Sequence, residues 1–193
     1  MTKKLIAHLR RNVVAYLALS IALGGTSYAA TRLPANSVDT RAIQNGAVKA
    51  EKLGKLPAVS ASADGTSQRL SDGVWSAVRL TQESFDVGGM HSSGENDSRL
   101  VAPRTGTYVV QGTAVFQAGV CCGTRSAEIS LHRASGGTVG VERVYAGGGD
   151  QTLAHLGAIV RMRAGDYLEL LALETSNQSL GVGGRLSAAF VGS

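Results

Sequence analysis

The chain has 193 residues, 25 of them glycine, with 5% aromatic residues, 17% charged residues and a net charge of +5. This composition favours a turn-rich β domain with one core over a helical bundle. Residues 57–193 hold ten arginines, no lysine and twelve acids, a local charge of −2. Because the excess of cation lies outside that segment, the charge pattern argues against a folded nucleic-acid-binding face.

The N-terminus has the order of a secretory signal peptide. A basic stretch, residues 1–11, precedes an uninterrupted apolar run over residues 13–23. That run is shorter than the roughly 20 apolar residues that span a bilayer. Ser27 and Ala29 then stand at the −3 and −1 positions of a cleavage site. We therefore predict that residues 1–29 form an export signal. The alternative is an uncleaved N-terminal anchor, which would be the chain's one contact with a membrane.

Residues 30–56 are predicted to form a stalk or linker. A ten-residue echo repeats Val38 as Val48, and an Asn45–Gly46 pair marks a turn between the two copies. One copy cannot bury its apolar residues alone, so such a repeat is stable only when it packs on neighbouring copies or on other chains. A disordered, slightly basic linker is the alternative, and the sequence leaves both open.

From residue 57 onward, short segments of alternating apolar and polar residues are separated by turn residues. This texture is typical of an antiparallel β-sandwich. Residues 106–116 place Tyr108 and Phe116 on one face, and residues 127–132 place polar side chains on the face opposite Ile129. Further strands are predicted at 138–145, 153–163, 166–174 and 186–192, and turns at 134–137, 146–150, 164–166 and 181–184.

Several short patterns in this region point to one family. An apolar strand ends in proline before Gly106-x-Tyr108 opens the next strand, and a Gly-Asp turn and a closing Ser-x-x-Phe-x-Gly follow later. Over residues 57–193 the chain resembles the C1q/TNF-like jelly-roll domain, in the form seen in exported bacterial proteins. The residues that carry the resemblance or fill its core positions are Phe85, Asp86, Leu100, Gly106, Tyr108, Phe116, Gly165, Asp166, Ser187, Phe190 and Gly192.

The match departs from the family's fullest signature at three positions. Leu100 stands where the family has phenylalanine, and Val110 and Gly112 stand where it has aromatic residues. The resemblance is therefore to the general domain. It implies an all-β jelly-roll sandwich, preceded here by the signal helix and the stalk, that packs as a homotrimer and recognises partners through loops or outer faces.

The resemblance also implies a function. We expect an exported homotrimeric binding or structural module, secreted or at the cell surface, rather than an enzyme. Its partner would be an extracellular protein, a glycan or an envelope component, with no nucleic acid. The alternatives are an assembly protein at the tip of a filament or fibre, a secreted hydrolase, or a lectin-like monomer.

No catalytic or cofactor-binding residue is predicted, because no nucleophile elbow, zinc-protease motif or phosphate loop occurs. The polar loop that follows His91 contains Glu95, Asn96 and Asp97. Oxygen ligands of this kind would suit calcium. A plain turn is the alternative.

The only two cysteines, Cys121 and Cys122, are adjacent. An exported protein meets an oxidising environment in which disulfides form. The Cα atoms of neighbouring residues lie about 3.8 Å apart, which is less than the usual Cα–Cα distance of about 4.4–6.8 Å across a disulfide. We rank a strained vicinal disulfide first, interchain disulfides between trimer subunits second, free thiols third and a metal site last.

Overall fold

The protein's structure is a computed structural model, and it divides into two units, Met1–Lys52 and Leu53–Ser193. We call the second unit the head. The residues that the structure describes are 6, 8, 10–29, 38, 41, 43–49, 54–65, 68–117, 123–146 and 152–192.

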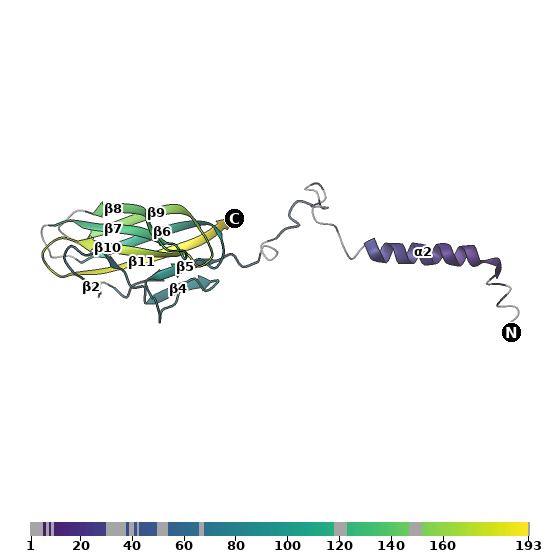
Figure 1. The fold of residues 1–193 in the computed structure, drawn as a ribbon, viewed down its shortest axis with the longest axis horizontal. Coiled ribbons are helices and arrows are strands. Elements are labelled where there is room, and N and C mark those ends of the chain that lie inside the picture. Colours follow the sequence, from purple (N-terminus) through teal and green to yellow (C-terminus); the bar gives the residue numbers. More distant parts are fainter. Residues whose placement is uncertain are drawn as a thin grey trace. The chain divides into compact units, whose positions relative to one another are not determined.

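The N-terminal unit contains helix α2, Val13–Ala29 (Figure 1). The helix covers the apolar run and ends at the last residue of the predicted export signal. Among the described residues, no helix is long and apolar enough to span a membrane. Further on, the Ala47 N–H donates to the Gln44 carbonyl (2.9 Å) and Gly46 has a φ of +78°, so the predicted turn is present.

Six strands of the head form one sheet, which we call sheet A. Its order is β4-β1-β11-β6-β9, and β2 also pairs with β11, all antiparallel. The strands are β1 (Ala58–Ser62), β2 (Gln68–Leu70), β4 (Gln82–Val87), β6 (Gly106–Phe116), β9 (Thr152–Met162) and β11 (Leu180–Gly192).

The other five strands form sheet B, with the order β3-β10-β7-β8 and with β5 also paired to β10. Both sheets are antiparallel, and the expected all-β sandwich is confirmed (Figure 1). The strands are β3 (Ser76–Ala77), β5 (Arg99–Val101), β7 (Arg125–His132), β8 (Thr138–Ala146) and β10 (Tyr167–Glu174).

The core lies between the two sheets and follows from the alternation of side chains along each strand. Every second residue of β6 is buried, beginning at Gly106 and ending at Phe116, as the sequence pattern predicted. Leu100, Tyr108 and Phe116 are fully buried. Phe85 lies outside the core, because it points outward from β4 and remains half-exposed.

The segment 181–184 is a strand, and the turn predicted there from its three glycines is wrong. It forms the first part of β11 and pairs with β6 and β2. A Cβ on Gly184 would lie 2.5 Å from the Thr113 carbonyl oxygen and 2.9 Å from Leu170 Cδ2. The glycine is therefore needed for the close approach of the β6 backbone and of the Leu170 side chain from sheet B, rather than for a change of chain direction.

The polar face of β7 is also buried, which alternation alone does not predict. Glu128 and Ser130 are 7% and 0% exposed although they point away from the core between the sheets. The Arg143 guanidinium lies against the Glu128 carboxylate and over the ring of Trp75, 4.9 Å from its centroid. Side chains from neighbouring segments thus cover this face.

Several of the residues that carry the resemblance to the C1q/TNF-like domain contact one another at the end of the head where the chain enters. The rings of Tyr108 and Phe190 meet edge to face with centroids 5.4 Å apart, and Arg104 lies over Phe190. A Cβ on Gly106 would lie 2.3 Å from the Phe190 ring, so only glycine fits there. Burial raises the pKa of Tyr108, and its phenol donates to the Arg104 carbonyl (2.7 Å).

The predicted Gly165–Asp166 turn lies at the same end. Gly165 has a φ of +86°, which favours glycine. The Asp166 carboxylate accepts the backbone N–H groups of Arg163 (2.8 Å) and Ala134 (3.0 Å) and the guanidinium of Arg133 (2.8 Å). Burial raises the pKa of Asp166, but these donors outweigh it and hold the pKa below its ordinary value.

The chain enters and leaves the head at this one end, which we call the entry pole. The Phe190 N–H donates to the Pro57 carbonyl (2.9 Å), so the beginning of β1 lies beside the end of β11. The opposite end, the far pole, carries the connections that follow β1, β6 and β10. Loops at the far pole are therefore separated from both ends of the head's own chain, near Pro57 and Gly192, by the length of the strands.

Candidate interaction surface

The outer face of sheet A carries exposed apolar side chains and, between some of them, rows of polar side chains. The pairing registers align residues of β1, β11, β6 and β9 in rows that cross the sheet. Directly opposite residues in such a row have neighbouring side chains.

Large apolar side chains remain exposed on this face. Val109 and Ile159 are paired neighbours in one row, with small alanines beside them on β11 and β1. Such a set exceeds the scattered single apolar residues that a monomer's surface normally shows. The set, which we call the apolar band, comprises Phe85 (51% exposed), Val109 (37%), Leu153 (53%), Ile159 (74%) and Val191 (57%).

A polar row crosses the same face between members of the apolar band. Ser62, Arg185, Thr113 and His155 are consecutive partners across β1, β11, β6 and β9. The Thr113 hydroxyl and His155 Nδ1 are hydrogen-bonded at 3.1 Å. We call these four residues the Arg185 row. In the next row, the Ser187 hydroxyl donates to Ser60 (2.9 Å).

A shallow pocket of about 430 Å³ opens beside the Arg185 row. Arg185 and Thr113 form one wall, and Val115 and the connection after β1 complete it. No acid points outward from β1, β6, β9 or β11 in their described residues. Glu142 of β8 reaches the edge of the face, where its carboxylate accepts the Gly157 N–H (2.8 Å).

The outer face of sheet B, by contrast, is closed by ion pairs and stacked rings. Glu169 lies 3.0 Å from His132 Nε2 and 3.4 Å from Arg99 Nε, and it accepts the Ser98 hydroxyl (2.7 Å). The Tyr167 ring contacts both of these side chains: it stacks on the His132 ring, with centroids 4.6 Å apart, and lies under the Arg99 guanidinium at 4.4 Å.

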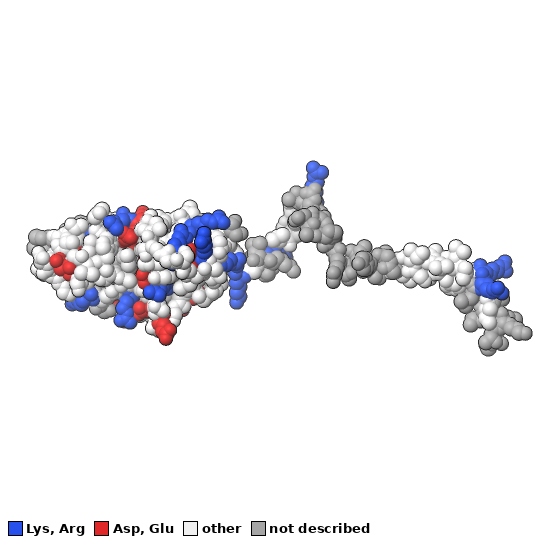
Figure 2. All heavy atoms as spheres, viewed as in Figure 1, with Lys and Arg blue, Asp and Glu red and all other residues white. Residues whose placement is uncertain are grey.

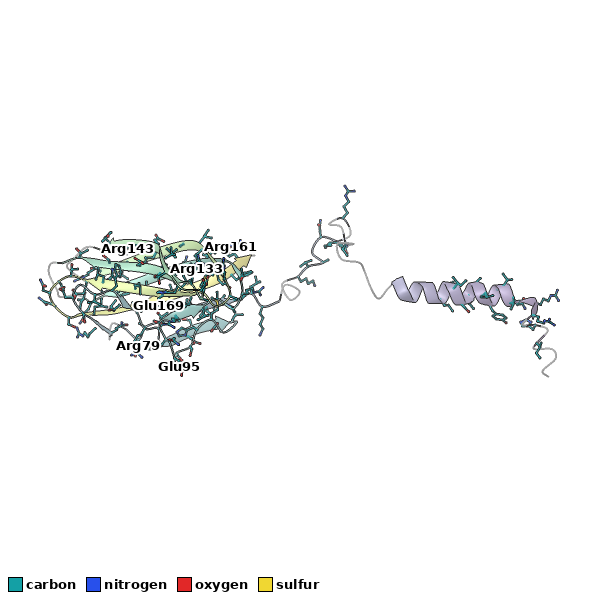
Figure 3. The ribbon with its side chains drawn as sticks, viewed as in Figure 1. Arg79, Glu95, Arg133, Arg143, Arg161 and Glu169 are labelled. Carbon is teal, nitrogen blue, oxygen red and sulfur yellow. The ribbon has the colours of Figure 1, made fainter. Side chains whose placement is uncertain are left out.

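The charges of the head are mixed rather than gathered into one field. Acidic and basic side chains are interspersed over its visible face (Figure 2). Arg133, Arg143 and Glu169, labelled in Figure 3, belong to the pairs with Asp166, Glu128 and Arg99 described above. Ion pairs thus cover much of the outer face of sheet B, although the buried Ser126 and Ser130 hydroxyls have no hydrogen-bond partner among the described residues.

The loop after β4 holds the three residues predicted as calcium ligands. The Asp97 carboxylate accepts from Arg79 (2.8 Å), and Asn96 adopts a positive φ of 55° in the turn. Glu95 lies in the same loop and is labelled in Figure 3. In the described part of the chain, no three His, Cys, Asp or Glu side chains form a group that could hold a metal ion. The structure therefore adds no support to the calcium alternative.

The described histidines of the head each have a neighbour in the fold. His91 is buried, with Nδ1 2.7 Å from a Glu83 carboxylate oxygen and Nε2 3.2 Å from the Asp97 carbonyl, so it ties the loop to β4. His132 and His155 lie on β7 and β9, as predicted, and contact threonine hydroxyls. The Asp86 carboxylate accepts from the backbone of Met90 and His91 and fixes the same loop.

The signature residues that close the fold lie on β11. Ser187 points outward beside Ser60, Phe190 points inward, and Gly192 pairs with Thr107 across a register shift. Cys121 and Cys122 lie outside the described residues. Their pairing therefore stays a prediction.

The head is similar to solved structures of the C1q and TNF group. The globular domain of zebrafish complement 1qA protein aligns with a TM-score of 0.52 and 12% identity, over 70% of this chain and 97% of that one. Murine APRIL gives a TM-score of 0.55 and 12% identity over 71% and 100%. Eiger TNF from S. frugiperda gives 0.52 and 11% identity over 72% and 94%.

No protein-family model matches the sequence, and no curated protein matches it. At 11–12% identity the structural likeness establishes the fold, and the predicted C1q/TNF-like jelly roll is confirmed. Function has to be argued from the surfaces of this chain, because one fold can carry many functions.

Proposed function

We propose that this protein is an exported, non-enzymatic binding module that acts as a homotrimer, secreted or at the cell surface. Three copies pack through the outer face of sheet A, and each head presents its far pole to an extracellular protein, glycan or envelope ligand. Three sites on one body bind a multivalent target with avidity even when each single contact is weak.

The observation that carries this proposal is the apolar band. Ile159 is 74% exposed at the β9 end of a paired row, next to Val109, and Phe85 and Val191 are each more than half exposed. Exposed apolar side chains on a single face favour association, because burying them removes apolar surface from water. The described strands of sheet B also expose Val101 (38%), Val139 (52%) and Tyr145 (71%), but none of these is paired with another of them, as Val109 is with Ile159.

The edge of sheet A supports a closed assembly rather than open growth. The β9 edge presents Leu153 and Ile159, while Glu142 occupies the Gly157 N–H that a further strand would need. An occupied backbone donor discourages strand addition at that point. Contacts through side chains of the face are therefore favoured over extension of the sheet.

The stalk supports the same assembly. Val38, Ile43 and Val48 of the ten-residue echo are about half-exposed in the single chain. Apolar residues of a short repeat gain a partner when copies pack side by side. Three stalks joined in this way would lead to three heads.

Export rests on the leader. Helix α2 holds the apolar run of the predicted signal, and the basic residues precede it. The order of the two segments is that of a secretory signal peptide. The structural neighbours named as complement and TNF proteins are compatible with an extracellular role for the same fold.

The test is the mass of the head, residues 53–193, in solution by light scattering. The head has its own core and forms its own compact unit, so it can be expressed alone. We expect the mass of three chains. Ile159→Asp should give a monomer, whereas Val74→Asp, a matched change at an exposed valine in a turn, should leave the trimer intact.

Other outcomes would redirect the proposal. A monomeric wild-type head at high concentration would refute the trimer and favour a lectin-like monomer. A mass that grows continuously with concentration would favour a filament-tip assembly. Repeating the measurement with reductant tests the cysteines: a trimer that dissociates only on reduction would show that Cys121 or Cys122 joins the chains.

A further inference from the structure

Arg185 differs from most arginines of the head in having no acceptor. Arg79, Arg99, Arg133 and Arg143 each lie against a carboxylate. By contrast, the Arg185 guanidinium has no hydrogen-bond or ion-pair partner among the described residues, although it stands on a central strand of sheet A. Asp64, which follows β1 two residues after Ser62, lines a neighbouring hollow with Arg69.

The surroundings of Arg185 supply further donors for a ligand. The Thr113 and Ser62 hydroxyls line the same pocket of about 430 Å³. His155 continues the row beyond Thr113. When the His155 Nδ1–H donates to the Thr113 oxygen, the single hydroxyl proton of Thr113 is left to donate to a ligand. A guanidinium flanked by hydroxyl groups matches a carboxylate, sulfate or phosphate group, since its fork binds two oxygens at once.

The proposed trimer would require a negative partner for Arg185. Packing through sheet A would take Arg185 out of water together with the apolar band. A buried charge without a partner is strongly destabilising. The described residues of β1, β6, β9 and β11 include no acid that could neutralise it, in its own or in an equivalent neighbouring copy. The exposed Glu83 of β4 already lies 2.7 Å from His91 Nδ1.

We infer that the pocket beside the Arg185 row binds a small oxyanion through the Arg185 guanidinium, with Thr113 and Ser62 as hydroxyl partners, and that this anion stabilises the trimer. The inference rests on the proposed trimer for its second half only, because the pocket is formed by a single chain. It assigns a ligand class to the face through which the copies would associate.

The experiment measures the melting temperature and the mass of the head in sodium sulfate against sodium chloride at equal ionic strength. Binding to the folded state alone raises the melting temperature in a saturable way. Sulfate also stabilises proteins in general by exclusion from their surface, so variants are needed. Phosphate and acetate, titrated in the same way, distinguish tetrahedral anions from a carboxylate.

Arg185→Met removes the guanidinium, and Arg161→Met is the matched control. Arg161 is an exposed arginine on the same face of β9 that lines no part of the pocket. We expect the saturable sulfate effect in the wild type and in Arg161→Met, and its loss in Arg185→Met. Thr113→Val should weaken sulfate binding about threefold to tenfold, the effect of one lost hydrogen bond.

Each outcome is decisive. An equal sulfate effect in all variants would show general salt stabilisation and overturn the inference. A trimer without any saturable anion effect would overturn it while leaving the proposed function intact. A monomer that binds sulfate through Arg185 would support the site and refute the trimer. Should Arg185→Met fail to fold, Arg185→Lys, which keeps the charge and loses the fork, must bind more weakly than the wild type.

Discussion

Replacement of Asp166 by asparagine tests how the turn before β10 is held. The carboxylate is 1% exposed and accepts three hydrogen bonds, two from the backbone of Arg163 and Ala134 and one from Arg133. An asparagine keeps one acceptor oxygen and turns an N–H₂ group toward a remaining donor. A buried N–H left without an acceptor costs about 1–3 kcal/mol, and loss of the ion pair with the partly exposed Arg133 adds about 0.5 kcal/mol.

We therefore expect Asp166→Asn to lower the free energy of unfolding of the head by about 2–3 kcal/mol at pH 7, measured by urea denaturation. With a slope of about 1.5–2 kcal/mol per M of urea, the midpoint would fall by roughly 1–2 M. Asp72→Asn is the control. Its exposed carboxylate accepts only the Asn177 N–H, and an amide oxygen can accept it equally well; we expect less than about 0.5 kcal/mol.

The pH dependence provides a second readout. The folded-state pKa of Asp166 lies below the unfolded value near 3.8. The stabilisation by the ionised carboxylate is therefore complete above that unfolded value and is lost as the pH falls through the folded pKa. The difference between wild type and Asp166→Asn should shrink over this range. A loss below about 0.5 kcal/mol at pH 7, or a difference that does not shrink in acid, would refute the reasoning.

Two further substitutions test the core. Tyr108→Phe removes a 2.7 Å hydrogen bond from the phenol to a backbone carbonyl and should cost about 1 kcal/mol in the same denaturation assay, with no cost if that bond is absent in solution. Gly184→Ala places a Cβ 2.5 Å from the Thr113 oxygen and 2.9 Å from Leu170, and should cost about 2–3 kcal/mol through overpacking. Gly94→Ala, which meets nothing within 4 Å, is the control and should leave stability almost unchanged.

The fold was predictable from the sequence where the alternation of apolar and polar residues within one strand determines which side of that strand is buried. The alternation along residues 106–116 matches the buried and exposed sides of β6 without exception, and the Gly165–Asp166 turn lies where its residues indicated. The glycines at 181–184 misled because a glycine serves two purposes, a turn or a close approach. The structure distinguishes the two uses, because a Cβ on Gly184 would lie 2.5 Å from the Thr113 carbonyl oxygen and 2.9 Å from Leu170.

The candidate surface was not predictable, because it depends on registers between distant strands. Arg185 and Thr113 are 72 positions apart in the chain, yet they are directly paired across β11 and β6. The calcium alternative also depended on contacts that the sequence does not show. Glu95, Asn96 and Asp97 are adjacent in sequence, but the carboxylate of Asp97 lies against Arg79, which no local pattern foretold.

The entry of the chain beside its exit has a mechanical consequence. If the leader or stalk holds the protein at a surface and a ligand pulls on the far pole, the load runs lengthwise through β1. That strand is flanked on both sides, with five paired residues on β11 and five on β4. Force in this direction shears the two ladders, so their hydrogen bonds must break together, whereas a pull from the side would open them one at a time. The two ladders of β1 would therefore resist tension applied between the entry pole and the far pole.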